Sequence, residues 1–311
     1  MMRADWLNAL LELLPDKVSE AIARVGDGEN LLEIRLRRNL PIQLVYPDGD
    51  RLIYGNGGRG MLGEEDSERL LLRICENSIY AWTDELKNGF VTLQGGIRVG
   101  ICGRAVQDDG HMERFSEVSS FNFRVVREIR GCASGLLPRL TDAEGGLLST
   151  LIISPPGAGK TTLLRDLVRL ISHGSGTAPQ RVSLIDERFE LAGCVRGIPQ
   201  FDVGPRTDVM SGMRKAQAMR RMTATMNPQL IATDELQFPS DIEAVLTAKS
   251  CGISILATAH GADIADIKKR KPMERLLKEK VFLRVVRLKG TGRIAGITDE
   301  NGREVEVCTD T

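Results

Sequence analysis

Aromatic residues and paired cysteines are scarce in this chain of 311 residues. Phe, Trp and Tyr together make up 4% of the sequence, which leaves few side chains on which the bases of single-stranded nucleic acid could stack. The six cysteines include no Cys-x-x-Cys pair, so we expect reduced thiols, mostly packed as small core residues, rather than disulfides or a zinc site.

Long hydrophobic runs are also missing. No apolar run approaches the ~20 residues of a membrane-spanning helix. The first residues lack the apolar segment and cleavage site of a secretory signal, so we expect a cytoplasmic protein.

The chain has no net charge, since 42 Lys and Arg residues balance 42 Asp and Glu residues. This balance argues against a protein that binds nucleic acid over its whole surface. Between residues 268 and 293, however, many Lys and Arg residues are opposed only by Glu274 and Glu279. Such a window is either a solvated helix face followed by a charged strand edge, or a docking surface for an acidic partner, a membrane or nucleic acid.

Length and pattern predict two domains with a boundary near residue 140. Residues 1–140 combine amphipathic helices with short alternating strands and turns, among them a hairpin at 90–106 and an extended run at 121–128. This pattern predicts a smaller α+β domain. From residue 141 onward strands alternate with helices, which is typical of an α/β domain with a mostly parallel sheet covered on both faces.

The elements of this second domain can be placed by periodicity. Strands are expected at 147–154, 181–186, 229–234 and 253–259, and helices at 161–172, 209–226 and 240–250. Three further extended runs, at 281–288, 293–298 and 304–307, predict an antiparallel finish with a turn at Asn301-Gly302.

The strongest functional signal is a run that joins an apolar strand to a helix: Ser154-Pro155-Pro156-Gly157-Ala158-Gly159-Lys160-Thr161-Thr162. Its glycines allow backbone N–H groups to approach a polyphosphate, Lys160 can reach the β- and γ-phosphates of ATP, and the Thr161 hydroxyl can bind Mg²⁺. The helix N-terminus faces the same phosphates. The usual pattern begins with Gly where this chain has Ser154. The strand-loop-helix context still favours a nucleotide site over an ordinary Gly- and Pro-rich turn.

Two carboxylate pairs end apolar strands. In P-loop enzymes such a strand end supplies an acid that orients Mg²⁺, a role for Asp234, and a base that polarises the attacking water, a role for Glu235. Asp186 and Glu187 end the preceding strand and would reach the same carboxyl edge of the sheet, where ligands bind. Either pair could instead be structural, satisfied by a helix N-terminus.

His260 ends another apolar strand, directly before Gly261. Thr258 lies two residues earlier and therefore on the same face of that strand. This arrangement favours a γ-phosphate sensor over a structural histidine.

The order and spacing of these motifs resemble the type II/type IV secretion ATPases. Residues 154–162 are similar to the Walker A motif, 186–187 to the Asp box, 234–235 to Walker B and 257–261 to the His box. Residues 33–37, 95–105 and 121–124 resemble the stage III sporulation protein AA family, and this similarity covers nearly the whole chain. The Asp box of secretion ATPases usually places Glu before Asp, so it stays open whether Asp186 or Glu187 contributes to catalysis.

The resemblance implies a RecA-like P-loop ATPase that uses ATP and Mg²⁺. It also implies a homo-oligomeric ring, with a hexamer expected, in the mother-cell cytoplasm. The ring would be peripheral to the membrane, docked on the membrane-channel proteins of a secretion-like complex that connects to the forespore, and would power or gate that channel.

Secretion ATPases bring arginines of their N-terminal domain to the nucleotide, so the first domain is also expected to form the ring. The candidates here are Arg98, Arg104, Arg124 and Arg127. The first two flank glycines that allow close approach of a ligand or another backbone. Each could also be an ordinary surface arginine.

Two other functions stay open. The first is an ATP-dependent single-stranded nucleic-acid-binding protein, because related ATPases of photosynthetic lineages carry an appended single-strand-binding module. We expect no such module here, since only a short tail follows Asn301-Gly302. The second is a nucleotide-bound scaffold with little turnover, against which Glu235 and His260 argue.

Overall fold

The computed structural model describes residues 3–26, 28–55, 60–108, 111–125, 128–290 and 292–305. The chain forms two compact units, residues 1–127 and 128–311. The boundary between the units thus lies between residues 127 and 128, on the N-terminal side of the boundary predicted near residue 140. The reason is that Ala133, Leu136 and Leu140 are fully buried in the core of the second unit.

The first unit contains a six-stranded antiparallel sheet in the order β3-β2-β1-β6-β5-β4. Its strands are β1 (Glu33–Arg37), β2 (Ile42–Tyr46), β3 (Gly49–Ile53), β4 (Phe90–Thr92), β5 (Arg98–Asp108) and β6 (His111–Arg124). The helices are α1 (Arg3–Leu13), α2 (Asp16–Ala23), α3 (Glu64–Ile74) and α4 (Thr83–Lys87), with short 3₁₀ helices at Gly28–Asn30, Ile79–Trp82 and Gln94–Gly96.

Strand β6 begins well before the extended run predicted at 121–128. It pairs with β5 over almost its whole length, with bulges along the way. The bulges interrupt the two-residue alternation by which a strand is recognised, and this explains why the first half of β6 escaped prediction.

The second unit contains a seven-stranded sheet in the order β13-β12-β7-β11-β10-β8-β9, and only the β12–β13 pairing is antiparallel. The strands are β7 (Thr150–Ser154), β8 (Val182–Asp186), β9 (Thr207–Ser211), β10 (Leu230–Thr233), β11 (Ser254–His260), β12 (Arg284–Lys289) and β13 (Arg293–Asp299). The helices are α5 (Lys160–His173), α6 (Lys215–Thr225), α7 (Pro239–Ser250), α8 (Ile264–Lys268) and α9 (Lys271–Lys278), with a 3₁₀ helix at Leu137–Arg139. The predicted α/β class with a mostly parallel sheet is confirmed.

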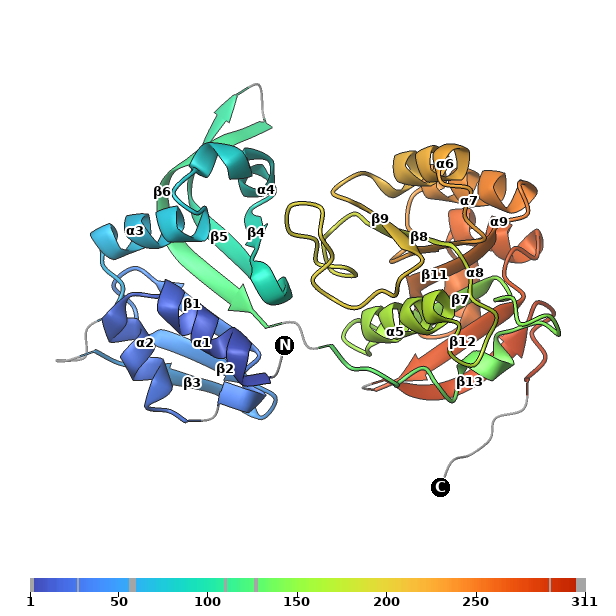
Figure 1. Cartoon of the computed structure of the whole chain (residues 1–311), viewed down its shortest axis with the longest axis horizontal. Helices are drawn as coiled ribbons and strands as arrows, with labels where there is room; N and C mark the ends of the chain where they lie inside the picture. The colour runs from blue at the N-terminus through green and yellow to red at the C-terminus, as the bar shows by residue number, and fades with distance from the viewer. Residues whose placement is uncertain are drawn as a thin grey trace. The chain divides into compact units, whose positions relative to one another are not determined.

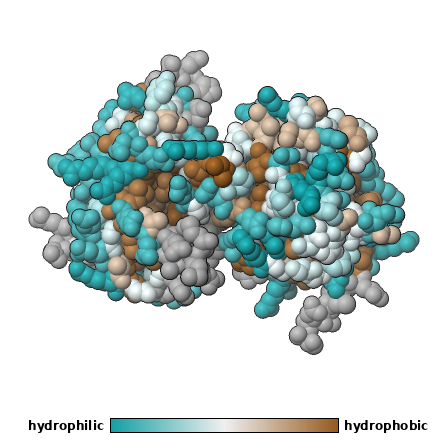
Figure 2. Space-filling model, in the orientation of Figure 1, coloured by the Kyte–Doolittle hydropathy of each residue, from teal (hydrophilic) through white to brown (hydrophobic). Residues whose placement is uncertain are grey.

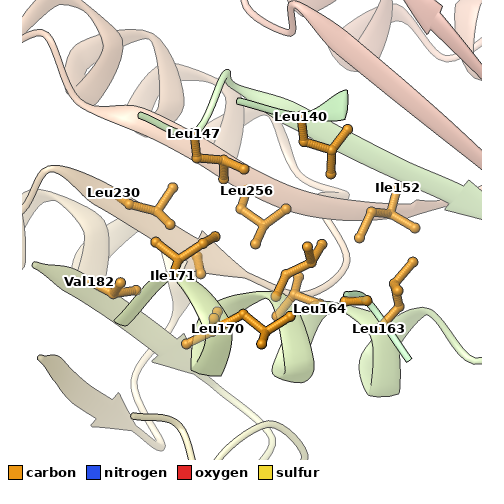
Figure 3. Packing of buried hydrophobic residues seen from close by; sticks show 14 of the residues in the cluster. Leu140, Leu147, Ile152, Leu163, Leu164, Leu170, Ile171, Val182, Leu230 and Leu256 are labelled. Carbon is orange, nitrogen blue, oxygen red and sulfur yellow. The ribbon is translucent and has the colours of Figure 1, made fainter. Parts of the chain in front are cut away.

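Helices cover both faces of this sheet, with α5 on one side and α6, α7 and α9 on the other (Figure 1). On the α5 side, Leu164 and Ile171 point at Leu230 and Leu256 of the central strands (Figure 3). Hydrophilic and intermediate residues make up most of the visible surface of this unit (Figure 2). The apolar strands are thus buried from both sides, as their continuous hydrophobic runs require.

The helix predicted at 209–226 is wrong in its first part. Residues 207–211 form β9, an edge strand parallel to β8, and α6 begins only at Lys215. Gly212 has φ +72°, a left-handed conformation that favours glycine and separates the strand from the helix. A short segment of mixed polar and apolar residues fits both the strand period and the helix period, and here the pairing with β8 makes it a strand.

The cysteines are less buried than predicted. Among the described residues Cys75 and Cys194 are buried, whereas Cys102, Cys132 and Cys251 are exposed; all five are free thiols. Cys308 lies outside the described residues. None of the helices in the described part of the chain is long and apolar enough to cross a bilayer.

Candidate nucleotide-phosphate site

Three neighbouring strands bring the predicted motifs together. Strand β11 lies between β7, which leads into the Walker A-like run, and β10, which leads into Asp234 and Glu235. His260 is in register with Ser154 of β7. Because parallel strands end at one edge, the loop, the acids and the histidine meet there.

The Walker A-like run forms a loop that closes around its own lysine. Gly157 and Gly159 have φ values of +74° and +87°, which a residue with a side chain rarely adopts, and α5 begins at Lys160. Lys160 Nζ donates to the carbonyl oxygens of Ser154 (3.0 Å) and Pro155 (3.1 Å). Burial lowers the pKa of Lys160, and the charge of Glu235 opposes this shift.

Ser154 stands where the usual motif has glycine, and its side chain contacts Lys160. Its side chain is fully buried, and its hydroxyl oxygen lies 3.0 Å from Lys160 Nζ while the hydroxyl donates to the Pro155 carbonyl at 2.8 Å. The hydroxyl therefore holds the lysine in the loop through a contact that glycine cannot make.

His260 connects this lysine to the candidate base. Its Nδ1 lies 3.0 Å from Lys160 Nζ, and its Nε2 lies 3.2 Å from Glu235 Oε1. An ammonium group has only donors, so Nδ1 must accept. Nε2 then carries the ring proton and faces the Glu235 carboxylate. His260 is thus in contact on one side with the lysine of the phosphate-binding loop and on the other with the acid after β10.

Glu235 is held in an unusual backbone conformation, with φ +27°. Its N–H donates to Thr258 Oγ1 at 2.9 Å, so this hydroxyl helps to position the acid. Arg188 Nη1 lies 3.4 Å from Glu235 Oε2, and Gln237 Nε2 contacts Oε1. The carboxylate is thus oriented by groups from three separate segments.

Asp234 lies beside a buried lysine. Lys215 Nζ is 3.1 Å from Asp234 Oδ1 and 2.9 Å from Glu187 Oε2. Burial alone would lower the pKa of Lys215, but Asp234 and Glu187 together raise it above its ordinary value. The two strand-end acids therefore share one counter-ion.

The residues fit a divalent cation in one respect. Asp234 Oδ1 is buried and, although Lys215 is close enough for an ion pair, no hydrogen-bond donor among the described residues is aligned with it. Such an oxygen is a suitable metal contact. In the part of the chain that the structure describes, no three or more His, Cys, Asp or Glu side chains gather as a metal centre. A cation here would complete its coordination with further oxygens, those of water molecules or of phosphates.

The hydrogen bonds of Asp186 fit the structural role that the sequence left open. It is fully buried, and its Oδ1 and Oδ2 accept four backbone N–H groups, those of Glu190, Leu191, Ala192 and Gly193, at 2.7–3.2 Å. The donors belong to a loop rather than to the helix N-terminus considered above. A carboxylate with both oxygens so occupied is not available to a water molecule.

The opposite side of that loop is held by α5. Arg165 Nη2 and Nε donate to the carbonyls of Glu190 and Leu191, each at 2.7 Å, and its guanidinium lies 4.2 Å from the ring centre of Phe201. The loop that follows Asp186, residues 187–193, is therefore hydrogen-bonded to α5, the helix that begins in the phosphate-binding loop. Glu187, in contact with Lys215, is the member of its pair that stays near Asp234.

Three of the candidate arginines, Arg98, Arg104 and Arg124, lie on strands of the first unit. Arg98 of β5 is directly opposite Arg124 of β6, and Arg98 stacks 3.7 Å from the ring centre of Phe90. Arg124 is 3.6 Å from Glu33, and the exposed Arg104 is 3.8 Å from Glu117. Arg127 lies outside the described residues.

Sequence reasoning missed three side chains of the second unit: Arg188, Lys215 and Gln237. Arg188 directly follows one acid pair and Gln237 lies two residues after the other, and this closeness in sequence could have identified them. Lys215 gives no such signal, because only the fold places the start of α6 beside the ends of β8 and β10.

Comparison with known proteins identifies the family. The family model described as "Sporulation stage III, protein AA" matches residues 6–305. The chain belongs to this family. It is 37% identical over 309 residues to stage III sporulation protein AA of Bacillus subtilis (strain 168), covering 97% of this chain and 98% of that protein. Protein SEEDLING PLASTID DEVELOPMENT 1 of Arabidopsis thaliana is 24% identical, with 87% of this chain but only 36% of the plant protein covered.

Solved structures show the same fold at low sequence identity. The ATPase DotB of Legionella pneumophila has a TM-score of 0.55 and 16% identity, covering 83% of this chain and 72% of DotB. The pilus retraction motor PilT, solved with bound ADP, has a TM-score of 0.54 and 13% identity, covering 88% and 76% of the two chains. This chain therefore has the fold of the secretion ATPases, as its motifs indicated.

Proposed function

We propose that this protein hydrolyses ATP with Mg²⁺ at the carboxyl edge of the second sheet. The observation that carries the proposal is the chain Lys160–His260–Glu235, with contacts of 3.0 and 3.2 Å. It connects the residue expected to bind the β- and γ-phosphates with the residue expected to polarise the attacking water. A scaffold that only holds nucleotide has no use for such a connection.

The residues have separate roles in this proposal. Backbone N–H groups of residues 157–161 and the start of α5 bind the phosphates, and Lys160 leaves its contacts with the loop carbonyls for phosphate oxygens. Glu235 accepts a hydrogen bond from the attacking water and orients it. When bound, Mg²⁺ would neutralise phosphate charge, held by Thr161 and Asp234.

We further propose that the protein acts as a homo-oligomeric ring, a hexamer by analogy, that powers or gates a channel between mother cell and forespore. The fold shared with an ATPase and with a pilus retraction motor supports a motor role. The family supports sporulation as the setting. An arginine of the first unit, among Arg98, Arg104 and Arg124, would reach the nucleotide of a neighbouring subunit.

The test compares two substitutions. Lys160→Ala removes the ammonium from the phosphates, so we expect both ATP binding and hydrolysis to be lost. Glu235→Gln keeps Asp234 and the loop, so we expect ATP binding to be retained and hydrolysis to fall at least about 100-fold. Hydrolysis by Glu235→Gln at the wild-type rate would show that the base is misassigned.

Oligomeric mass in ATP, measured with wild type and Glu235→Gln, tests the ring. We expect the variant to accumulate the assembled form because it binds ATP without consuming it. Turnover measured with and without single-stranded DNA separates this motor from a nucleic-acid-dependent ATPase, which DNA would stimulate.

A further inference from the structure

Lys215 is a buried cation that the proposed reaction does not use. Its side chain is 6% exposed, it opens α6, and its ammonium contacts Glu187 at 2.9 Å and Asp234 at 3.1 Å. Burying a lysine is costly unless it is paired, and these two carboxylates pair it. They come from the ends of β8 and β10, so Lys215 joins the Asp box to the acid expected to bind Mg²⁺.

The neighbouring charges do not offer Asp234 another counter-ion. The Arg188 guanidinium pairs with Glu235 at 3.4 Å. The nearby acid Asp186 accepts backbone N–H groups of its loop. In the described part of the chain, the ion pair of Asp234 is the one with Lys215. The ammonium therefore lies within contact distance of the same oxygen that a cation, or a water molecule bound to one, would contact.

We propose that Lys215 and a divalent cation compete for Asp234, so that loading of the metal with nucleotide moves Lys215 off Asp234 and leaves it paired with Glu187 alone. Two positive charges cannot share one carboxylate oxygen at contact distance without strong repulsion. The lysine contacts both acids and holds them together, and its release reports metal loading to the start of α6.

This inference rests on the proposed use of Mg²⁺ by Asp234, but its test needs no ATP hydrolysis. The full chain without nucleotide is titrated with Mn²⁺, and free Mn²⁺ is followed by electron paramagnetic resonance. Lys215→Met leaves two adjacent carboxylates without their cation, so we expect one Mn²⁺ to bind about tenfold more tightly than in wild type, or better. Unchanged or weaker binding by Lys215→Met would overturn the proposal.

Matched variants locate the effect. Lys215→Arg keeps the charge and is expected to bind Mn²⁺ like wild type. Adding Asp234→Asn to Lys215→Met is expected to abolish the gain. Lys249→Met removes a lysine of α7 that contacts the carbonyl of Lys280, and is expected to change nothing. A gain that survives Asp234→Asn would place the metal elsewhere and sink the idea.

A second measurement uses the wild-type chain, in case Lys215→Met does not fold. Acetylation of Lys215 by an amine-reactive reagent is followed by peptide mass spectrometry, without additions and with Mn²⁺ or Mg²⁺ and ATP. Release from Asp234 is expected to raise its modification rate severalfold, while Lys249 stays constant. An unchanged Lys215 rate in protein that binds and hydrolyses ATP would refute the competition and leave the proposed function intact.

Discussion

Nδ1 of His260 accepts a hydrogen bond from Nζ of Lys160 at a distance of 3.0 Å. The histidine can do this only with its proton on Nε2, which is the nitrogen that faces Glu235. Binding of phosphates to Lys160 would therefore be felt at Glu235 through a single side chain.

His260→Ala removes both contacts of this chain. We expect KM for ATP to change little, because Lys160 keeps its other partners, and kcat to fall by about 100-fold as Glu235 loses its orientation. Steady-state hydrolysis measures both constants. His173→Ala, at the other end of α5, is the control and should retain wild-type kcat. A wild-type kcat for His260→Ala would remove the histidine from the mechanism.

Asp186→Ala leaves four backbone N–H groups of the following loop without their acceptor. Each buried amide left unpaired is costly, so we expect the free energy of unfolding to fall by about 3 kcal/mol or more. Urea denaturation followed by circular dichroism measures it. Asp208→Ala, on the exposed edge strand β9, should change stability by less than about 0.5 kcal/mol. Equal stability of the two variants would contradict the structural role of Asp186.

Asp166 of α5 ties down the segment at the start of the second unit. It accepts the N–H groups of Gly131 (3.1 Å) and Ala133 (2.8 Å) and pairs with Arg169 at 2.7 Å. Burial raises the pKa of this carboxyl, but the two N–H groups and Arg169 together lower it below 3.8.

A lowered pKa in the folded state stabilises the protein above the unfolded value of 3.8, and this contribution is lost as the pH falls through the folded value. Asp166→Asn should therefore be less stable than wild type at pH 7, and the difference should shrink on acidification below about pH 4. Denaturation curves over this range measure it. A difference that does not vary with pH would show that charge is not what Asp166 contributes.

The arginine proposal predicts that ATPase activity rises faster than linearly with protein concentration, because a neighbouring subunit completes the site. Single substitution of Arg98, Arg104 or Arg124 by Ala should leave ATP binding intact and slow turnover for at least one of them. Arg69→Ala, on the exposed face of α3, serves as the control. Constant specific activity across the assembly concentration would exclude a contribution in trans.

Part of the basic window at 268–293 is accounted for inside the fold. Arg270, Arg275 and Lys278 form ion pairs with Asp266, Glu279 and Glu274. At the start of the window, Lys268, Lys269 and Lys271 are the docking candidates. We expect the joint substitution of these three lysines by Glu to weaken binding to anionic liposomes that carry the channel's membrane subunits, measured by co-sedimentation. The difference from wild type should depend on the salt concentration, because salt screens exposed charges. Equal binding by wild type and variant would make the window a solvated face.

The motifs could be predicted because their chemistry is local. A glycine loop followed by Lys160, and acids directly after apolar strands, can be recognised without knowing any neighbour. The contact of Lys215 with Asp234 could not, because it depends on where α6 starts, and the segment before it alternates too weakly to separate strand β9 from helix. The role of Asp186 was equally hidden, since backbone N–H groups of a loop leave no mark on residue type.

The loop after β8 has one more property. Asp186 takes four successive N–H groups of this loop, and Arg165 takes two of its carbonyls. The bonds to Asp186 require a fixed number of residues between Asp186 and the N–H groups of 190–193. Inserting or deleting one residue directly after Asp186 would move these N–H groups out of position to bond its carboxylate. The length of this stretch is therefore as constrained as the side chains of Leu191 and Ala192, which are fully buried in the core.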